Sequence, residues 1–168
     1  WNATSGEEQH VLKAHSGRVN SVAIQSDTVV SGSDDGTVRI WNATSGEEQH
    51  ELKGHSNAVN SVAIQGDTIV SGSSDNTVRI RNATLGEEQH VLKGHSDWVL
   101  SVAIQGDTIV SGSDDNTVRI WNATSGEEKH VLKGHSHPVY SVAIQGDIIV
   151  SGSWDKTVRI WNSTSGEE

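Results

Sequence analysis

The chain has 168 residues, a formal net charge of −10 and an apolar content of 33%, and it contains no Cys, Met or Phe. The acidic charge repels phosphate backbones and argues against nucleic acid as a partner, while the absence of cysteine excludes disulfides and thiolate metal sites. No apolar run approaches the roughly 18 residues of a membrane span and no stretch resembles a signal peptide, so we expect a cytoplasmic protein without membrane contact.

One pattern of forty residues recurs along the whole chain. Of the 40 positions, 27 are identical in all four copies, and self-similarity at this period is typical of solenoids and propellers. The chain begins in mid-repeat and without Met, so we expect a processed chain or a piece of a longer one. We expect a single domain over residues 1–168, with repeats at about 14–53, 54–93, 94–133 and 134–168 and an N-terminal strand within residues 1–13.

In the third repeat, four short segments rich in β-branched or polar residues alternate with turn residues. Gly106-Asp107 suits a tight hairpin because glycine supplies the positive φ, and the polar run from Asp114 to Asn116 suits the next turn. Ser125-Gly126 makes the third turn, and the last segment is polar, as an outer edge should be. The expected strands are Val99–Gln105, Thr108–Ser113, Thr117–Ala123 and Glu128–Lys133.

Four short strands in forty residues predict one antiparallel meander per repeat. A lone sheet of this size cannot cover both of its faces, so neighbouring copies must stack face to face at about 10 Å. Radial stacking gives an all-β propeller with one four-stranded antiparallel blade per repeat and four blades per chain.

The motif of each repeat resembles the WD-repeat family. It consists of Gly-His followed, further along the repeat, by Ser-Gly-Ser-x-Asp-x-Thr-Val-Arg-Ile-Trp-Asn, and it recurs along the whole chain. Two features depart from the family pattern. Trp-Asn replaces Trp-Asp, and Ala14 stands where the other copies have glycine.

The resemblance implies a structural role for one His, Ser, Asp and Trp in each repeat. In WD repeats the matching residues form a buried chain of hydrogen bonds, in which His bridges the turn Asp and the strand Ser, and the Ser accepts from the indole. Buried indole and imidazole groups need such partners, and four identical copies favour a scaffold over a single active site, so we expect no catalytic residues. The expected sets are His15, Ser31, Asp35 and Trp41; His55, Ser71 and Asp75 with Arg81; His95, Ser111, Asp115 and Trp121; and His135, Ser151, Asp155 and Trp161.

Two details of this network stay open in the sequence. Ser33 points to the same side of its strand as Ser31, so either serine type fits the network. Arg81 stands where the other copies have Trp, and its guanidinium either pairs with Asp75 or turns outward and buries only its stem.

Metal ligation is not expected. His90 and His95 are five residues apart, which places them on opposite faces of a strand, and His135 beside His137 is already assigned to the network. We therefore expect no metal and no cofactor. The sequon that opens at Asn2 and recurs in each copy is a by-product of the repeat.

The copies differ mostly at two places, the loop before the first strand and the turn between the second and third strands. A meander places both on one face, which we call the variable face, and variation on a constant scaffold indicates recognition. Trp98, Tyr140 and Trp154 make a candidate hot spot there, with neutral drift at exposed loops as the alternative. The expected partner-binding residues are Arg18, Asn20, Asp34, Asn60, Trp98, Leu100, His137, Tyr140 and Trp154.

The two ends of the chain complement each other. It starts with an unpaired fourth strand, Glu8 to Lys13, and ends after a third strand, Thr157 to Ser163. These ends would close either a tight four-bladed ring in one chain or an eight-bladed ring in two chains. Two-fold dimers are the commonest oligomers, so we favour a homodimer in which each copy completes the partner's last blade.

Two functions fit these observations. The first is a non-catalytic interaction scaffold that binds a protein or peptide of unknown identity on the variable face. The second is a purely structural, self-assembling propeller, or a fragment of a longer repeat protein, with no dedicated partner. An enzyme would need a unique cluster of titratable groups, and the groups outside the repeat pattern show no catalytic arrangement.

Overall fold

The computed structural model describes residues 4–168, so Trp1 and Asn2 lie outside the described part. The first sheet contains β1 (Val19–Gln25), β2 (Thr28–Ser33), β3 (Val38–Asn42) and β4 (Glu48–Leu52). The second contains β5 (Val59–Gln65), β6 (Thr68–Ser73), β7 (Thr77–Asn82) and β8 (Glu88–Lys93). The third contains β9 (Val99–Gln105), β10 (Thr108–Ser113), β11 (Thr117–Asn122) and β12 (Glu128–Lys133). The fourth contains β13 (Val139–Gln145), β14 (Ile148–Ser153) and β15 (Val158–Asn162).

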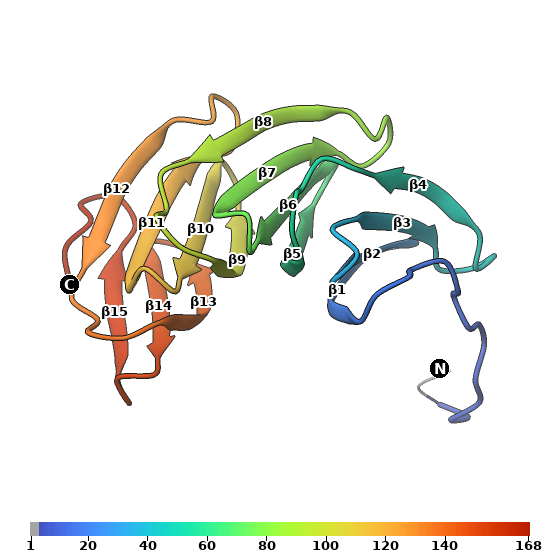
Figure 1. The fold of residues 1–168 in the computed structure, drawn as a ribbon, viewed down its shortest axis with the longest axis horizontal. Coiled ribbons are helices and arrows are strands. Elements are labelled where there is room, and N and C mark those ends of the chain that lie inside the picture. Colours follow the sequence, from blue (N-terminus) through green and yellow to red (C-terminus); the bar gives the residue numbers. More distant parts are fainter. Residues whose placement is uncertain (1–3) are drawn as a thin grey trace.

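Each sheet is an antiparallel meander whose strands follow one another in chain order, which confirms the all-β fold predicted from the repeat. We call each sheet a blade. Successive inner strands β1, β5, β9 and β13 lie next to one another, and the outer strands β4, β8 and β12 line the convex side of an arc (Figure 1). No helix is present in residues 4–168, and hence none that could cross a membrane.

The core lies between the blades, in three similar clusters of buried side chains. Within each blade, alternate residues of a strand point to opposite faces, so each of the two internal blades contributes to the cluster before it and to the cluster after it. Between the third and fourth blades, the side chains are those of Val110, Val118, Ile120 and Leu132 on one side and Val139, Val142, Ile149 and Trp161 on the other.

A glycine in the second strand of each blade allows this close packing. A Cβ atom at Gly112 would lie 2.8 Å from Val139 Cγ1, closer than two such atoms can approach. Gly32 and Gly72 face the next blade in the same way. The glycine of the Ser-Gly-Ser motif therefore sets the spacing between blades.

The arc is open, and its two ends are far apart (Figure 1). The predicted strand at residues 8–13 is not formed, because no strand lies beside it to exchange backbone hydrogen bonds. The fourth blade correspondingly has three strands, as the sequence predicts. A single chain thus leaves one blade without its outer strand and one segment without a blade.

Candidate functional site

The His-Ser-Asp-Trp network runs through each complete motif. In the third blade, His95 donates from Nδ1 to Asp115 Oδ2 and accepts at Nε2 from the Ser111 hydroxyl, both at 2.8 Å. The Trp121 indole donates to Ser111 Oγ at 2.8 Å. Thr117 Oγ1 adds a hydrogen bond of 2.6 Å to Asp115 Oδ1. The network ties the loop before the blade to the second and third strands.

The sequence left undecided which serine belongs to the network, and the structure shows that it is the first serine of each Ser-Gly-Ser motif. Ser31 Oγ lies 2.8 Å from His15 Nε2 and accepts from the Trp41 indole at 2.9 Å. Ser33 instead accepts from the Asp35 backbone N–H at 3.2 Å and shapes the turn. The fourth blade repeats this arrangement with His135, Ser151, Asp155 and Trp161.

The side chains of this network are placed to hold the fold. The Ser111 side chain is fully buried, its proton is donated to His95, and its oxygen already accepts from an indole. A substrate therefore has no access to the hydroxyl. The same contacts recur from blade to blade, which suits a scaffold that fixes one loop conformation.

The carboxylates of the network are strongly acidic. Burial alone would raise the pKa of Asp75, but hydrogen bonds from Thr77 and His55 outweigh it and lower the pKa to about 2. In the same network burial lowers the pKa of His55, and the nearby Asp75 offsets this only in part. The imidazole is therefore neutral and the carboxylate ionised at neutral pH.

Arg81 adopts neither of the two expected arrangements. Its side chain is 2% exposed, Nη2 donates to the Lys53 carbonyl at 2.8 Å, and the same nitrogen lies 3.2 Å from Glu88 Oε2. The Nη1 atom is buried without a hydrogen-bond partner. Glu88 is the cross-strand neighbour of Arg81, so a strand register would have identified this partner from the sequence.

The variable face is formed as predicted, because each turn is hydrogen-bonded to the loop beside it. The Asp114 N–H donates to the Trp98 carbonyl at 2.9 Å, and the Trp154 N–H donates to the Pro138 carbonyl at 3.0 Å. The variable residues of one blade therefore lie next to one another. His137 lies on the same loop and is exposed.

The aromatic residues of this face are open to solvent. Tyr140 and Trp154 are 54% and 67% exposed, and Trp98 is 49% exposed. Tyr140 and Trp154 meet edge to face, with ring centroids 6.1 Å apart. A shallow hollow beside this pair extends to Lys156 and Val158.

The equivalent positions of the first and third blades differ in charge pairing. Asp34 accepts from Asn20 Nδ2 at 2.7 Å and lies 3.3 Å from Arg18 Nε. In the third blade both partners are replaced by apolar residues, Trp98 and Leu100. Burial, and then the charges of Asp97 and Asp115, raise the pKa of Asp114. This part of the face therefore carries an acidic group next to an exposed indole.

The asparagines Asn20 and Asn60 also have a structural role, in addition to their place on the variable face. The Asn20 amide donates to the Val59 carbonyl of the next blade at 3.1 Å, and Asn60 donates to Val99 O at 2.9 Å. They join neighbouring blades across the variable face. In both contacts the asparagine and the carbonyl are 39 residues apart, so the repeat length was the sequence signal for this link between blades. Among residues 4–168, no three or more His, Asp or Glu side chains gather closely enough to hold a metal ion.

The two end blades expose faces that are buried elsewhere. In the last blade Val158 and Ile160 are 73% and 60% exposed, whereas their equivalents Val118 and Ile120 are 0% exposed. In the first blade Val22 is 68% exposed, whereas Val62 is 6% exposed. Each end therefore presents one half of the interface that joins every internal pair of blades.

The N-terminal segment is already docked on the first blade as an outer strand would be. His10 Nε2 donates to the Thr44 carbonyl at 2.9 Å. His50, His90 and His130, on the outer strands, make the same contact with the following blade. The segment thus occupies the position of the outer strand of a preceding blade that the single chain does not contain.

Comparison with known proteins agrees with this architecture. The family model of the WD domain, G-beta repeat, matches residues 6–42, 46–82, 86–122 and 126–162. The DENN domain and WD repeat-containing protein SCD1 of Arabidopsis thaliana is 40% identical over 40 residues, which are 24% of this chain and 3% of that protein. The chain therefore spans only a small part of that relative.

Three solved structures are similar over most of the chain. The computationally designed Ika4 protein is 30% identical with a TM-score of 0.88, over 94% of this chain and 98% of its own. The computationally designed Ika8 protein is 30% identical with a TM-score of 0.85, over 90% of this chain and 48% of its own. U3-55K is 25% identical with a TM-score of 0.87, over 91% of this chain and 51% of its own.

Proposed function

We propose that this chain, which belongs to the WD-repeat family, is a non-catalytic scaffold that binds a protein or peptide on its variable face. The observation that carries the proposal is the exposed aromatic pair Tyr140 and Trp154, with Trp98 on the neighbouring blade. Exposed tryptophan and tyrosine are the side chains that most often dominate binding energy at protein interfaces. The hydrogen-bond network holds the loops that carry them, so little conformational entropy is lost on binding.

The alternative is a purely structural propeller without a dedicated partner. The similarity to the designed Ika4 and Ika8 proteins supports this alternative, since the same arc exists in chains made by design. The two functions differ in what they require of the variable face, because only a binding scaffold needs the aromatic side chains there.

A selection from a displayed peptide library distinguishes these two functions. The variant Trp98→Ala, Tyr140→Asn, Trp154→Ser replaces each aromatic by the residue found at the same position of the second repeat, Ala58, Asn60 and Ser74. Peptides enriched on the unmodified chain should bind this variant at least about tenfold more weakly. Failure to enrich any peptide, or equal affinity for the variant, would support the structural alternative.

The scaffold works, in this proposal, as an eight-bladed ring of two chains. The N-terminal segment of each copy would pair with β15 of the other in the register of the internal blades. By equivalence with Val118↔Leu132 and Ile120↔His130, Val158 would face the partner's Leu12, and Ile160 the partner's His10. The half coverage of the longer Ika8 and U3-55K chains supports this, since their folds accommodate the whole arc and about as much chain again.

In this ring, the sequences repeated at the two chain ends would compete for equivalent positions. Arg159 pairs with Glu168, at the position where Arg119 pairs with the first residue of β12. The partner's Glu8 is the equivalent of Glu168 and would take over this contact.

The pairing of Val158 with the partner's Leu12 can be tested by mutation. Leu12→Asp should abolish dimerisation, and Leu85→Asp, at another exposed leucine, should leave it unchanged. A dimer that survives Leu12→Asp would rule out this strand exchange.

A further inference from the structure

At the first two internal junctions, an asparagine of one blade reaches across the variable face to the backbone of the next blade. Asn20 and Asn60 donate to the carbonyl at the start of the following inner strand. One residue of the neighbouring turn reaches the loop just before it, since Asn76 Nδ2 donates to the Ser96 carbonyl at 3.3 Å. The loop before β9 is therefore held at two points by the preceding blade, and the loop before β5 at one.

The last blade carries different residues at both of these positions. Tyr140 replaces the asparagine, and Lys156 replaces Asn76. Lys156 keeps a φ of 71°, close to the 69° of Asn76, although lysine tolerates this region poorly. Such strain is retained mostly at positions with a function.

One more junction of the same geometry brings a specific part of a second copy to these residues. Tyr140 would lie at the partner's Val19 carbonyl, and Lys156 would lie at the partner's Ser16 carbonyl. Residue 18 stands between these two points in the sequence. In this arrangement the partner's Arg18 would lie at the edge of the Tyr140–Trp154 pair.

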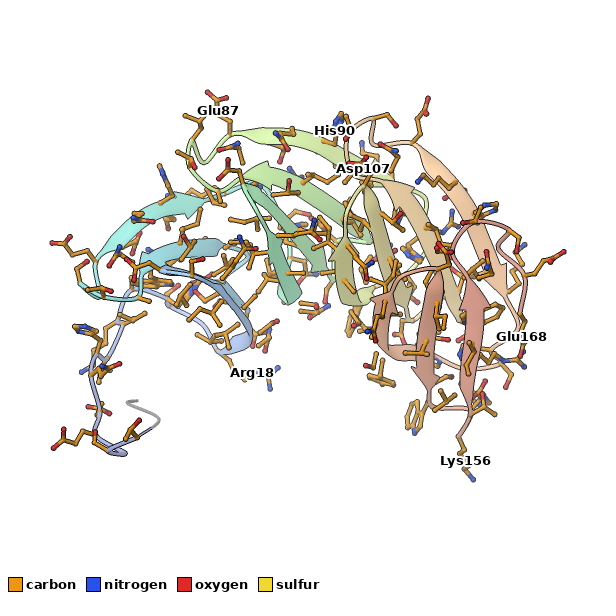
Figure 2. The ribbon with its side chains drawn as sticks, turned by 180° about the vertical axis from the view of Figure 1, so that it is seen from behind. Arg18, Glu87, His90, Asp107, Lys156 and Glu168 are labelled. Carbon is orange, nitrogen blue, oxygen red and sulfur yellow. The ribbon has the colours of Figure 1, made fainter. Side chains whose placement is uncertain are left out.

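Arg18 and Lys156 lie on the two end blades, at opposite ends of the arc (Figure 2). They do not meet within one open chain. The Arg18 side chain is 78% exposed, with Nε donating to Asn20 Oδ1 at 3.0 Å and lying 3.3 Å from Asp34 Oδ2. Its two terminal nitrogens make no hydrogen bond in the described part of the chain, so they are available to a ligand.

The chemistry of this junction defines its ligand. A guanidinium fork binds carboxylates through paired hydrogen bonds, and the exposed faces of Trp154 and Tyr140 bind apolar side chains. The part of the hollow lined by Gly152 and Val158 would be filled by the partner's Val19 and Val22, so the ligand would lie on the open rim of the aromatic pair, beside the partner's Arg18. The site therefore matches a peptide with a carboxylate next to an apolar residue.

We propose that each junction of the two-chain ring is a composite binding site for such a peptide, formed by Tyr140 and Trp154 of one copy and Arg18 of the other. The proposal rests on the proposed function, and it adds the ligand class and the contribution of the second copy. The ring would carry two such sites.

The first test uses the purified dimer and three pools of fluorescent peptides with random flanks. The central tripeptide is Leu-Glu-Leu in one pool, Leu-Gln-Leu in the second and Leu-Lys-Leu in the third. The Glu pool should bind about tenfold more tightly than the Gln pool, and Arg18→Ala should remove this preference. Alanine is present at the equivalent position of the second repeat, so the variant is expected to fold.

The second test shows that two copies build the site. An Arg18→Ala chain and a Trp154→Ser chain, with different tags, are coexpressed and the heterodimer is purified. One of its junctions contains both native residues, and the other contains neither. The heterodimer should therefore bind one Glu peptide per ring with unmodified affinity, whereas either homodimer should bind none at that affinity.

The outcomes separate this proposal from the broader one. A heterodimer without an intact site, beside an unmodified ring with two, would overturn the composite site. Peptide binding that depends on Trp154 but is equal for Glu and Gln would overturn the carboxylate specificity and leave the scaffold function in place. A ring that binds none of the three pools would overturn the composite site, and the library selection then decides the scaffold function on its own.

Discussion

Arg81 places a guanidinium where the other repeats bury an indole, and its Nη1 has no hydrogen-bond partner. A buried unpaired donor is costly, and burial lowers the pKa of the group, with Glu88 opposing this effect. Arg81→Trp should raise the free energy of unfolding by about 1 kcal/mol or more, since the introduced indole adds apolar burial and can donate to Ser71 Oγ.

Urea unfolding followed by circular dichroism measures this effect. Trp121→Arg is the matched reverse change and should destabilise the chain, because the Trp121 indole donates to Ser111. If Arg81→Trp leaves the urea midpoint unchanged or lowers it, the network does not contribute as described.

The network also predicts how stability depends on pH. Asp75 has a pKa of about 2 against an ordinary value of 3.8, so its contribution is present above pH 3.8 and is lost as the pH falls toward 2. The lowered pKa of His55 acts with the same sign, because the unfolded chain binds a proton below pH 6.5 more readily than the folded chain.

Unfolding midpoints from neutral pH down to pH 2 test this prediction. Asp75→Asn should be less stable than the unmodified chain at neutral pH and should lose less stability between pH 3.8 and 2. Equal losses in the two proteins would mean that Asp75 is not the titrating group.

At the scale of the strand, the sequence predicted most of the fold because its signals are local. Val99–Gln105 and Thr108–Ser113 begin and end where expected, since glycine and aspartate fix the turns between them. The segment at residues 8–13 has the same sequence pattern as β12 and forms no strand. A strand needs a neighbour, and the position of that neighbour depends on the whole arc.

The candidate site was predictable to a similar extent. The shared face of loop and turn follows from the meander, so the exposed positions of Trp98, Tyr140 and Trp154 were predicted correctly, and their binding of a partner stays a prediction. The link from Asn20 to the next blade was missed, because it depends on the geometry between blades. The ion pair of Arg81 with Glu88 was missed because it depends on the register of β7 and β8.

Substitutions at the glycines of the second strands test packing within the chain separately from packing between copies. A Cβ at Gly112 would meet Val139 Cγ1 at 2.8 Å, whereas a Cβ at Gly152 would meet only Ser141 Cβ, at 4.0 Å. Gly112→Ala should therefore destabilise the folded chain by about 1–3 kcal/mol. Gly152→Ala should leave the single chain folded and raise the dimer Kd about tenfold or more, because this glycine would face the partner's Val19 and Val22.

Urea unfolding and dilution of the dimer measure these two effects. Gly32→Ala, in the first blade, should resemble Gly112→Ala because its Cβ would lie 2.6 Å from Val59 Cγ1. A Gly152→Ala chain that dimerises as tightly as the unmodified chain would show that this face is not the interface.

At the scale of the whole molecule, the arc is a repeated interface that stops after three copies. The unpaired halves remain at its ends, with exposed Val22 on the first blade and exposed Val158 and Ile160 on the last. Apolar faces of this kind are rarely left in water. In the two-chain ring that we propose, a second copy would cover both, and a two-fold axis would make the two new junctions identical.

The solution mass tests this account most directly. Light scattering on a sizing column, or native mass spectrometry, distinguishes one chain of 18.0 kDa from two. We expect a single species at twice 18.0 kDa that persists on dilution. A compact species of 18.0 kDa would contradict the two-chain ring, and with it the composite site at the junction.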